Sequence, residues 1–247
     1  MSYLPSAAGI FPVTPAQNLW LFAALSAIFA FIGRLVRGVT SGGAVAGAVV
    51  CFLLLVGGGF GAFGALLAVF LLTWIATRFG YRRKERLGTA EARSGRNALQ
   101  VVANLGVATG CAILHAQCPN PWIFVAMAAV LAEAAGDTVS SEIGQALGGT
   151  PRLITTGQKV VPGTNGAITA VGTASGAVAA IMVALVFYGL GEVGRASFLV
   201  IAFSGIAGMI GDSLLGATIE GHARLGNNAV NFISTVIAAA IAFLLAS

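Results

Sequence analysis

Roughly eight runs of apolar residues, each about long enough to cross a lipid bilayer as a helix, follow one another along this sequence. They cover approximately residues 18–37, 41–58, 60–79, 98–115, 121–146, 165–188, 196–218 and 228–246. The second and third runs are separated only by the stretch "GGGFG", which predicts a tight hairpin or a re-entrant pair. Helices satisfy their own backbone groups inside lipid. The sequence therefore predicts an all-α, polytopic membrane helix bundle with about eight transmembrane spans.

The composition agrees with a lipid environment. Of the 247 residues, 57% are hydrophobic and only 9% are charged, whereas a soluble domain has about 25% charged residues. The 34 glycines suit close packing of helices in a membrane. Residues 1–247 are therefore predicted to form a single integral membrane domain, with polar loops at about 80–97 and 148–164.

The basic residues predict the orientation of the bundle. All but one of the 13 Lys and Arg residues fall in connections of one parity, and Arg195 is the exception. Because basic loops stay in the cytosol, both termini are expected outside and both polar loops inside. The net charge of +5 is then a consequence of membrane topology, and no nucleic acid partner is expected.

Two acidic motifs end apolar spans. "AGDTVSSEIG" contains Asp137 and Glu142, and "GDSLLGATIEG" contains Asp212. At 1.5 Å per residue, each aspartate lies roughly 24–25 Å from the outer start of its span, so both are expected at a similar depth near the cytosolic face. Carboxylates exposed to lipid are unfavourable, and the two are therefore expected to face each other or to share a cation.

The residues around these acids favour magnesium. Mg²⁺ prefers a few oxygen ligands and keeps several waters when it binds phosphates. Mg²⁺ is the predicted cofactor, and the predicted metal ligands are Asp137, Asp212 and Glu142. The alternative is that these acids only form hydrogen bonds to neighbouring helices.

Three further cytosolic stretches suit phosphate binding: "RSGRNALQVVAN", "GQKVVPGTNGAI" and "GNNAVN". Each is a Gly- or Ser-bearing turn that leads into an expected helix start, where free N–H groups and the helix dipole favour anions. Arg96 and Lys159 are predicted to act in catalysis together with the two aspartates. The predicted substrate- and nucleotide-binding residues are Arg93, Ser94, Asn97, Asn104, Ser141, Glu142, Thr164, Asn165, Ser213, Asn227, Asn228 and Asn231. The alternative for Arg93, Arg96 and Lys159 is topological charge, and the alternative for the "GTNG" and "NN" turns is ordinary helix capping.

The order of "RSGRNALQVVAN", "AGDTVSSEIG", "LITTGQKVVPGTNGAIT", "GDSLLGATIEG" and "NNAVNFIS" closely resembles the transmembrane-protein-19-like family. That family includes the phytyl-phosphate kinase of plants and cyanobacteria, and the resemblance covers about residues 20–246. More remotely, the chain is similar to CTP-dependent polyprenol kinases and CDP-diacylglycerol synthases. It departs from the family's Lys-Arg-Thr-Ser-Gly run, because residues 91–95 read "EARSG" with a single basic residue, and from the Gly after the Asn, because Leu105 follows Asn104.

The resemblance implies a membrane kinase of tocopherol biosynthesis. Such an enzyme transfers the γ-phosphate of a nucleoside triphosphate, with CTP the expected donor, to an isoprenyl monophosphate such as phytyl phosphate. The expected location is a bacterial inner membrane, or a thylakoid or plastid membrane, with the active site facing the cytosol. A prenyl monophosphate is already anionic, since its second pKa is about 6, and it needs no general base.

Other functions fit parts of the pattern. A cytidylyltransferase would use the same metal and nucleotide, and a prenol kinase would act on the free alcohol. A secondary transporter also places acids inside the membrane, although these acids and the phosphate-type turns lie toward one face only. The chain length of the prenyl group and the assembly of the chain into a homo-oligomer are left open by the sequence.

Overall fold

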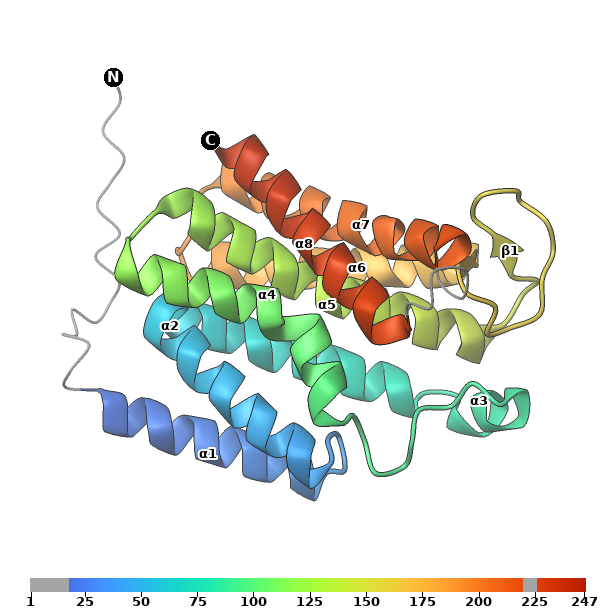
Figure 1. Cartoon of the computed structure of the whole chain (residues 1–247), viewed down its shortest axis with the longest axis horizontal. Coiled ribbons are helices and arrows are strands. Elements are labelled where there is room, and N and C mark those ends of the chain that lie inside the picture. Colours follow the sequence, from blue (N-terminus) through green and yellow to red (C-terminus); the bar gives the residue numbers. More distant parts are fainter. Residues whose placement is uncertain (1–17, 220–225) are drawn as a thin grey trace.

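Helices form almost all of the regular structure in the computed structural model, which describes residues 18–219 and 226–247 (Figure 1). The elements are α1 (Leu19–Leu35), α2 (Ser41–Arg78), α3 (Tyr81–Leu87), α4 (Ala98–Gln117), α5 (Pro121–Leu147), β1 (Arg152–Leu153), β2 (Ala167–Ile168), α6 (Ala170–Gly189), α7 (Arg195–Thr218) and α8 (Asn227–Ala246). Within the described ranges, 6 helices are long and apolar enough to cross a membrane, and α1 is a shorter apolar helix of 17 residues. The predicted all-α, polytopic bundle is confirmed.

Helix α2 contains two of the predicted spans. Its backbone leaves helical geometry at Gly59, where φ is 63° and ψ is −158°. The carbonyl oxygen of Val36, just before α2, accepts a hydrogen bond of 3.2 Å from Trp74 Nε1 near the end of α2, and also one from Arg78. The two ends of α2 therefore meet, and α2 is an antiparallel hairpin. We call its arms the first arm (residues 41–58) and the second arm (residues 60–78).

The arms of α2 complete an alternating topology. With the arms taken separately, the chain makes successive passes through α1, the first arm, the second arm and α4 to α8. Figure 1 shows the C-terminus and the start of α1 at one end of the bundle, and α3 and β1 at the opposite end. This is the parity expected from the basic residues, although Arg224 and the last two residues of "GDSLLGATIEG" lie outside the described residues.

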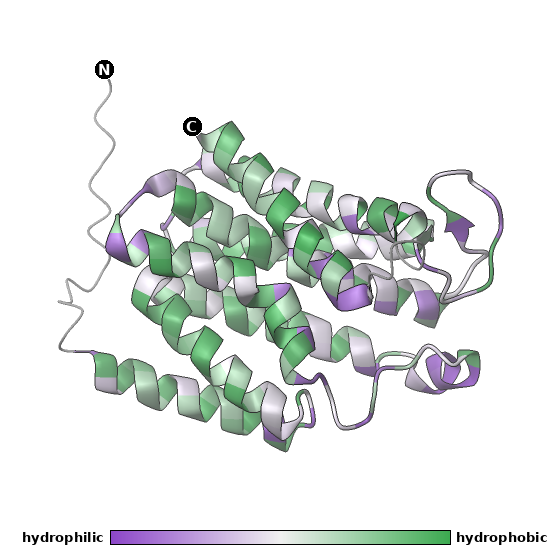
Figure 2. Cartoon of the chain, in the orientation of Figure 1, coloured by the Kyte–Doolittle hydropathy of each residue, from purple (hydrophilic) through white to green (hydrophobic). Residues whose placement is uncertain are grey.

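Helix α5 is the centre of the bundle. It packs against α2, α3, α4, α6, α7 and α8. The contact with α6 requires glycine, because a Cβ atom on Gly176 would lie 2.5 Å from the carbonyl oxygen of Gly136 and 2.4 Å from the sulfur of Met209. Close approach of helices through small residues is typical of membrane proteins. Figure 2 shows apolar residues along most of the helix surfaces and hydrophilic residues gathered toward the ends.

The second polar loop extends beyond the predicted residue 164 and contains a short two-stranded sheet. Strands β1 and β2 pair antiparallel, with Arg152 opposite Ile168 and Leu153 opposite Ala167. Helix α6 begins at Ala170, so the predicted start at residue 165 was wrong. The reason is that Thr169 forms the N-cap, and its hydroxyl accepts a hydrogen bond of 3.0 Å from the Gly172 amide.

Candidate functional site

A cavity of about 270 Å³, here called the polar cavity, lies at the end of the bundle that carries α3 and β1. Helices α5 and α7 form two of its walls, and α4, the start of α8 and the loop before α6 form the others. The polar cavity brings together many of the residues predicted from sequence. These are Arg96, Asn104, Asp137, Ser141, Glu142, Thr164, Asn165, Asp212, Ser213, Asn227 and Asn231.

The two aspartates meet inside this cavity. Asp137 and Asp212 both line the cavity and interact with each other, and the charge of Arg96 acts on Asp137. Glu133 lies one turn before Asp137 on α5, is 1% exposed, and interacts electrostatically with both aspartates. The structure thus produces the pairing that the similar depth of Asp137 and Asp212 predicted.

The donor set fits magnesium better than a metal that requires a complete protein cage. Among the described residues, no three His, Cys, Asp or Glu side chains are arranged to hold a metal ion. Mg²⁺ needs only one or two carboxylates, with waters and substrate phosphates as its remaining ligands. Asp137 and Asp212 would supply that pair if Mg²⁺ bound here, and Gln145, also in the cavity wall, has a buried Oε1 atom with no hydrogen-bond partner.

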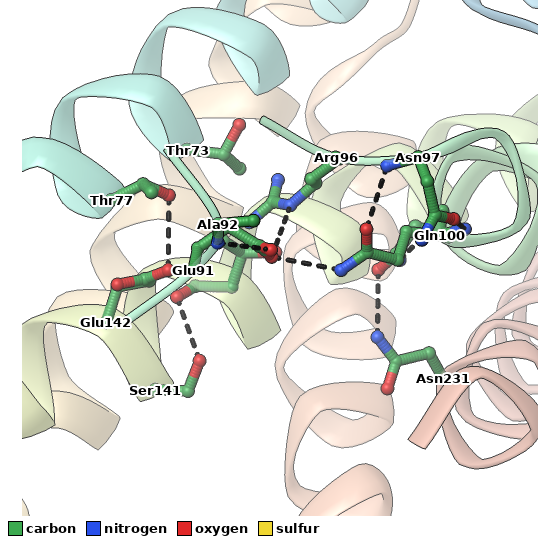
Figure 3. Close-up of polar contacts among 12 residues, drawn as sticks. Thr73, Thr77, Glu91, Ala92, Arg96, Asn97, Gln100, Ser141, Glu142 and Asn231 are labelled. Atoms are coloured by element: carbon green, nitrogen blue, oxygen red, sulfur yellow. Dashed lines mark hydrogen bonds and ion pairs between the residues drawn. The ribbon is translucent and has the colours of Figure 1, made fainter. Parts of the chain in front are cut away.

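Glu142 has a different environment from the two aspartates. Its Oε2 atom forms an ion pair with Lys84, and its Oε1 atom accepts a hydrogen bond of 3.2 Å from Thr77 (Figure 3). The Lys84 side chain is fully buried and also donates to the carbonyl oxygens of Ala76, at 3.0 Å, and Thr77, at 2.8 Å. A buried charge must be paired, so Glu142 compensates the buried charge of Lys84. Glu142 also lines the polar cavity, and its role as a metal ligand stays a prediction.

Arg96 has a fixed backbone and an available side chain. Its N–H donates to Gly38 at 3.0 Å, and its carbonyl oxygen accepts from Thr40 at 2.9 Å. This close approach needs Gly95, which has φ of 83° and whose added Cβ would lie 2.4 Å from the Gly38 backbone. The Arg96 guanidinium lies 4.0 Å from Glu91, which is a loose pairing. Arg96 can therefore turn toward an anion without loss of a short ion pair.

Glu91 organises the loop that carries Arg96 (Figure 3). Its Oε2 atom accepts a hydrogen bond of 2.9 Å from Gln100, and its Oε1 atom accepts one of 2.9 Å from the Ala92 amide. Gln100 in turn forms a capping box with Asn97, in which each side chain accepts from the other residue's backbone N–H, at 2.8 and 3.0 Å. Asn97 is therefore a helix cap.

Two of the predicted asparagines bind each other. Asn231 on α8 donates to Asn104 on α4 at 3.2 Å, and Asn104 donates to the Gln100 carbonyl at 2.8 Å. Ser234, one turn further along α8, donates to Glu133 at 2.7 Å. These bonds join α4, α5 and α8 beneath the polar cavity. The amide of Asn104 is thus committed to the helix contact, whereas the side-chain oxygen of Asn231 stays available on the cavity wall.

Helix starts at the cavity offer backbone donors. The N-cap of α8 is Gly226, which has no side-chain cap. Among the described residues, the backbone N–H groups of Asn227 and Asn228 have no hydrogen-bond partner. Free N–H groups at a helix start suit a phosphate. Asn227, which lines the polar cavity, therefore stays a predicted phosphate-binding residue. The "GTNG" turn also lines the polar cavity, but it leads into β2 and not into a helix. Its Gly166, with φ of 71°, packs against α7, where an added Cβ would lie 2.4 Å from Ala217.

Several predicted residues do not line the polar cavity. They are Arg93, Ser94, Asn97, Lys159 and Asn228. Lys159 is exposed between β1 and β2, in a backbone bridge with Arg152, so the structure does not bring it into the polar cavity, and its catalytic role stays a prediction. The cause is the β1–β2 pairing, which carries residues 154–161 away from the cavity. Arg93 lies 2.7 Å from Glu85, and this hydrogen bond raises the pKa of the Arg93 guanidinium.

The sequence reasoning missed several polar residues of the site: Arg83, Lys84, Glu91, Gln100 and Gln145. Lys84 and Arg83 look like topological charges in a run of basic residues, and no spacing distinguishes the buried one. The pair Asn97 and Gln100 did carry a signal, because an N-cap residue followed three positions later by Gln is the pattern of a capping box.

A second cavity, here called the apolar cavity, adjoins the first. It has a volume of about 360 Å³ and lies between α1, both arms of α2, α4 and α5. The two cavities share five lining residues, here called the shared wall: Glu91, Arg96, Gln100, Asn104 and Thr138. An apolar cavity that opens beside a polar one can hold an amphipathic molecule with its head at the shared wall.

Comparison with known proteins identifies the family. Residues 24–239 match the family described as integral membrane protein DUF92. An uncharacterized membrane protein of Synechocystis is 38% identical over 72% of this chain and 70% of its own length, and one of Methanocaldococcus jannaschii is 35% identical over 82% and 84%. The chloroplastic protein VTE6 of Arabidopsis thaliana is 31% identical over 99% of this chain and 74% of its own length.

No solved structure matches the chain significantly. The family match, together with a cyanobacterial and a chloroplastic relative, agrees with the expected location in a bacterial inner membrane or a thylakoid or plastid membrane. The family match also agrees with the resemblance found in the motifs, all of which lie within residues 24–239. The chain belongs to the DUF92 family of integral membrane proteins.

Proposed function

We propose that this protein is a membrane kinase that transfers the γ-phosphate of a nucleoside triphosphate, with CTP the expected donor, to an isoprenyl monophosphate. The observation that carries the proposal is the shared wall between the two cavities, where Arg96 faces both. The nucleotide would enter the polar cavity from the water side, and the prenyl chain would remain in the apolar cavity. Arg96 is then positioned to hold the phosphate that joins them, because a guanidinium can grip a phosphate with two parallel hydrogen bonds.

Phosphoryl transfer requires alignment and neutralised charge more than a protein nucleophile. An oxygen of the prenyl monophosphate attacks the γ-phosphorus, the bond from that phosphorus to the β-bridging oxygen breaks, and the nucleoside diphosphate leaves with the electron pair. The products are a prenyl diphosphate and a nucleoside diphosphate. No base is needed, and neither His115 nor Cys111 lines the polar cavity.

The residues of the polar cavity would have different roles in this reaction. Asp137 and Asp212 would hold Mg²⁺, which neutralises charge on the nucleotide phosphates when it is bound. Arg96 would bind the acceptor phosphate, and the free N–H groups at the start of α8 would bind donor phosphates. Asn231 and Ser213 would orient the nucleotide from the α8 and α7 sides of the cavity.

The test is a product analysis with purified protein in detergent, Mg²⁺ and each nucleoside triphosphate in turn. Equal amounts of a prenol and the matching prenyl monophosphate compete in the same reaction, and mass spectrometry identifies the products. We expect prenyl diphosphate and the nucleoside diphosphate to dominate. Dominant prenyl monophosphate would indicate a prenol kinase, and release of pyrophosphate with a cytidylylated lipid would indicate a cytidylyltransferase.

A further inference from the structure

The apolar cavity is polar at one end only. Four arginines line that end, here called the arginine rim: Arg37, Arg78, Arg93 and Arg96. Arg78 donates to the Val36 carbonyl and stacks on Trp74, with its guanidinium carbon 4.5 Å from the ring centre. Arg93 is paired with Glu85. Arg96 is only loosely paired, and it is the member of the rim that also lines the polar cavity.

Two polar side chains of the second arm that line the cavity, Thr73 and Trp74, are already hydrogen-bonded to backbone carbonyls. The Thr73 hydroxyl donates to the Val69 carbonyl at 2.8 Å, and the Trp74 indole donates to the Val36 carbonyl at 3.2 Å. Phe29 and Phe70 pack edge to face, with ring centres 5.5 Å apart. A space lined mainly by apolar side chains favours apolar groups.

The form of the cavity indicates what fits. It is a single, mainly apolar space of about 360 Å³ with arginines at one end. This arrangement suits a molecule with one apolar chain, whose phosphate lies at the rim.

Two residues stand at different depths in the cavity. At 1.5 Å per residue, Gly47 lies about 9 Å from the rim end of the first arm, and Leu66 lies about 18 Å from the rim end of the second arm. Leu66 is 2% exposed and closes the deep end. Gly47 lines the wall partway down, and a Cβ atom added there would contact only Phe29, at 3.9 Å. A larger residue at Gly47 would therefore shorten the cavity, and a smaller one at Leu66 would lengthen it.

We propose that the apolar cavity binds the isoprenyl chain of the phosphate acceptor, and that Gly47 and Leu66 determine the longest chain it accepts. The identity of the acceptor rests on the proposed function. The chain lies along the first and second arms of α2, and its phosphate contacts Arg96 at the shared wall. Substrate selection is thus a property of the α2 hairpin, while phosphoryl transfer is a property of α5 and α7.

The test measures binding of isoprenyl monophosphates with one to four isoprene units to the purified protein without nucleotide, by native mass spectrometry. For the unaltered protein, we expect affinity to rise with chain length up to a limit. Gly47→Leu should lower the affinity for the longest accepted chain at least tenfold and change that for the shortest less than twofold. Gly110→Leu is the matched control, because Gly110 has no atom within 4 Å of an added Cβ and does not line the cavity.

Leu66→Ala provides a second variant of opposite sign. It should move the limit toward longer chains, a gain that damage to the fold would not produce, and it decides the question if Gly47→Leu does not fold. Equal loss of all chain lengths in Gly47→Leu, or an unmoved limit in Leu66→Ala, would overturn the inference. Equally good binding of a two-chain phosphatidic acid would also overturn it.

The two proposals fail in distinguishable ways. A protein that shows the expected shifts in chain length but transfers no phosphate would contradict the proposed function alone. A protein that transfers phosphate with no effect of Gly47→Leu or Leu66→Ala on chain length would contradict the chain-length inference alone.

Discussion

The polar and apolar cavities share a wall but are built in opposite ways. The polar cavity lies where helices end, so its walls combine side chains with unpaired backbone groups, such as those at the start of α8. The apolar cavity runs from the loop end down between the helices, and the small residue Gly47, where an added Cβ would meet only Phe29 at 3.9 Å, leaves space there. The charged side chains of the two cavities are therefore gathered at the loop end of the bundle. The shared wall is the place where one molecule can contact both cavities, with a charged head group and an apolar chain.

The largest expected effect concerns the polar cavity. Asp137→Asn and Asp212→Asn should each reduce phosphate transfer at least about a hundredfold, since the loss of a metal carboxylate removes several kcal/mol of transition-state stabilisation. Steady-state assays of the purified variants measure this, with Glu192→Gln, in the connection between α6 and α7, as the control. Retention of more than about a tenth of the activity by both variants would remove the aspartate pair from the mechanism.

The next effect separates structure from chemistry at the edge of the polar cavity. Lys84→Met should lower the free energy of unfolding by about 3–5 kcal/mol, because it leaves the Glu142 carboxylate buried without its partner. The double variant Lys84→Met, Glu142→Leu should recover much of that loss. Thermal unfolding in detergent measures both, and a stable single variant without activity would instead assign Lys84 to the chemistry.

A smaller effect is expected at the shared wall. Arg96→Ala should reduce kcat/KM for the prenyl phosphate about 10- to 100-fold, in keeping with roughly 1.5–3 kcal/mol for a hydrogen bond to a charged group. Arg96→Lys should recover only part, because an ammonium cannot form the paired hydrogen bonds of a guanidinium. The exposed Arg86 on α3 supplies the control Arg86→Ala. An equal effect of both alanine variants would show that Arg96 acts only through general charge.

The smallest effect is expected from Lys159→Ala. Its side chain is exposed between β1 and β2 and lines neither cavity, so kcat/KM should change less than about twofold, the range of ordinary surface substitutions. A loss of tenfold or more would mean that the β1–β2 loop closes over the polar cavity during turnover, and it would support the catalytic role predicted from sequence.

The sequence predicts the spans well because lipid imposes a single strong constraint on length and polarity. Even the α2 hairpin is visible in "GGGFG", since Gly59 adopts a backbone conformation that other residues rarely adopt. The pairing of Asp137 and Asp212 follows from their equal depth. Which face a loop residue presents does not follow from such patterns. Lys159 and Lys84 look alike in sequence, and tertiary packing alone makes one exposed and the other buried.

The central claim is that a γ-phosphate passes to a lipid phosphate at the shared wall. The most direct measurement supplies purified protein with Mg²⁺, a prenyl monophosphate and CTP labelled in either the α- or the γ-phosphate, and follows the label into the lipid. The account predicts that only the γ-label appears in the lipid, as prenyl diphosphate, and that Asp137→Asn and Arg96→Ala reduce its appearance. Transfer of the α-label, or no transfer with any nucleoside triphosphate, would contradict it.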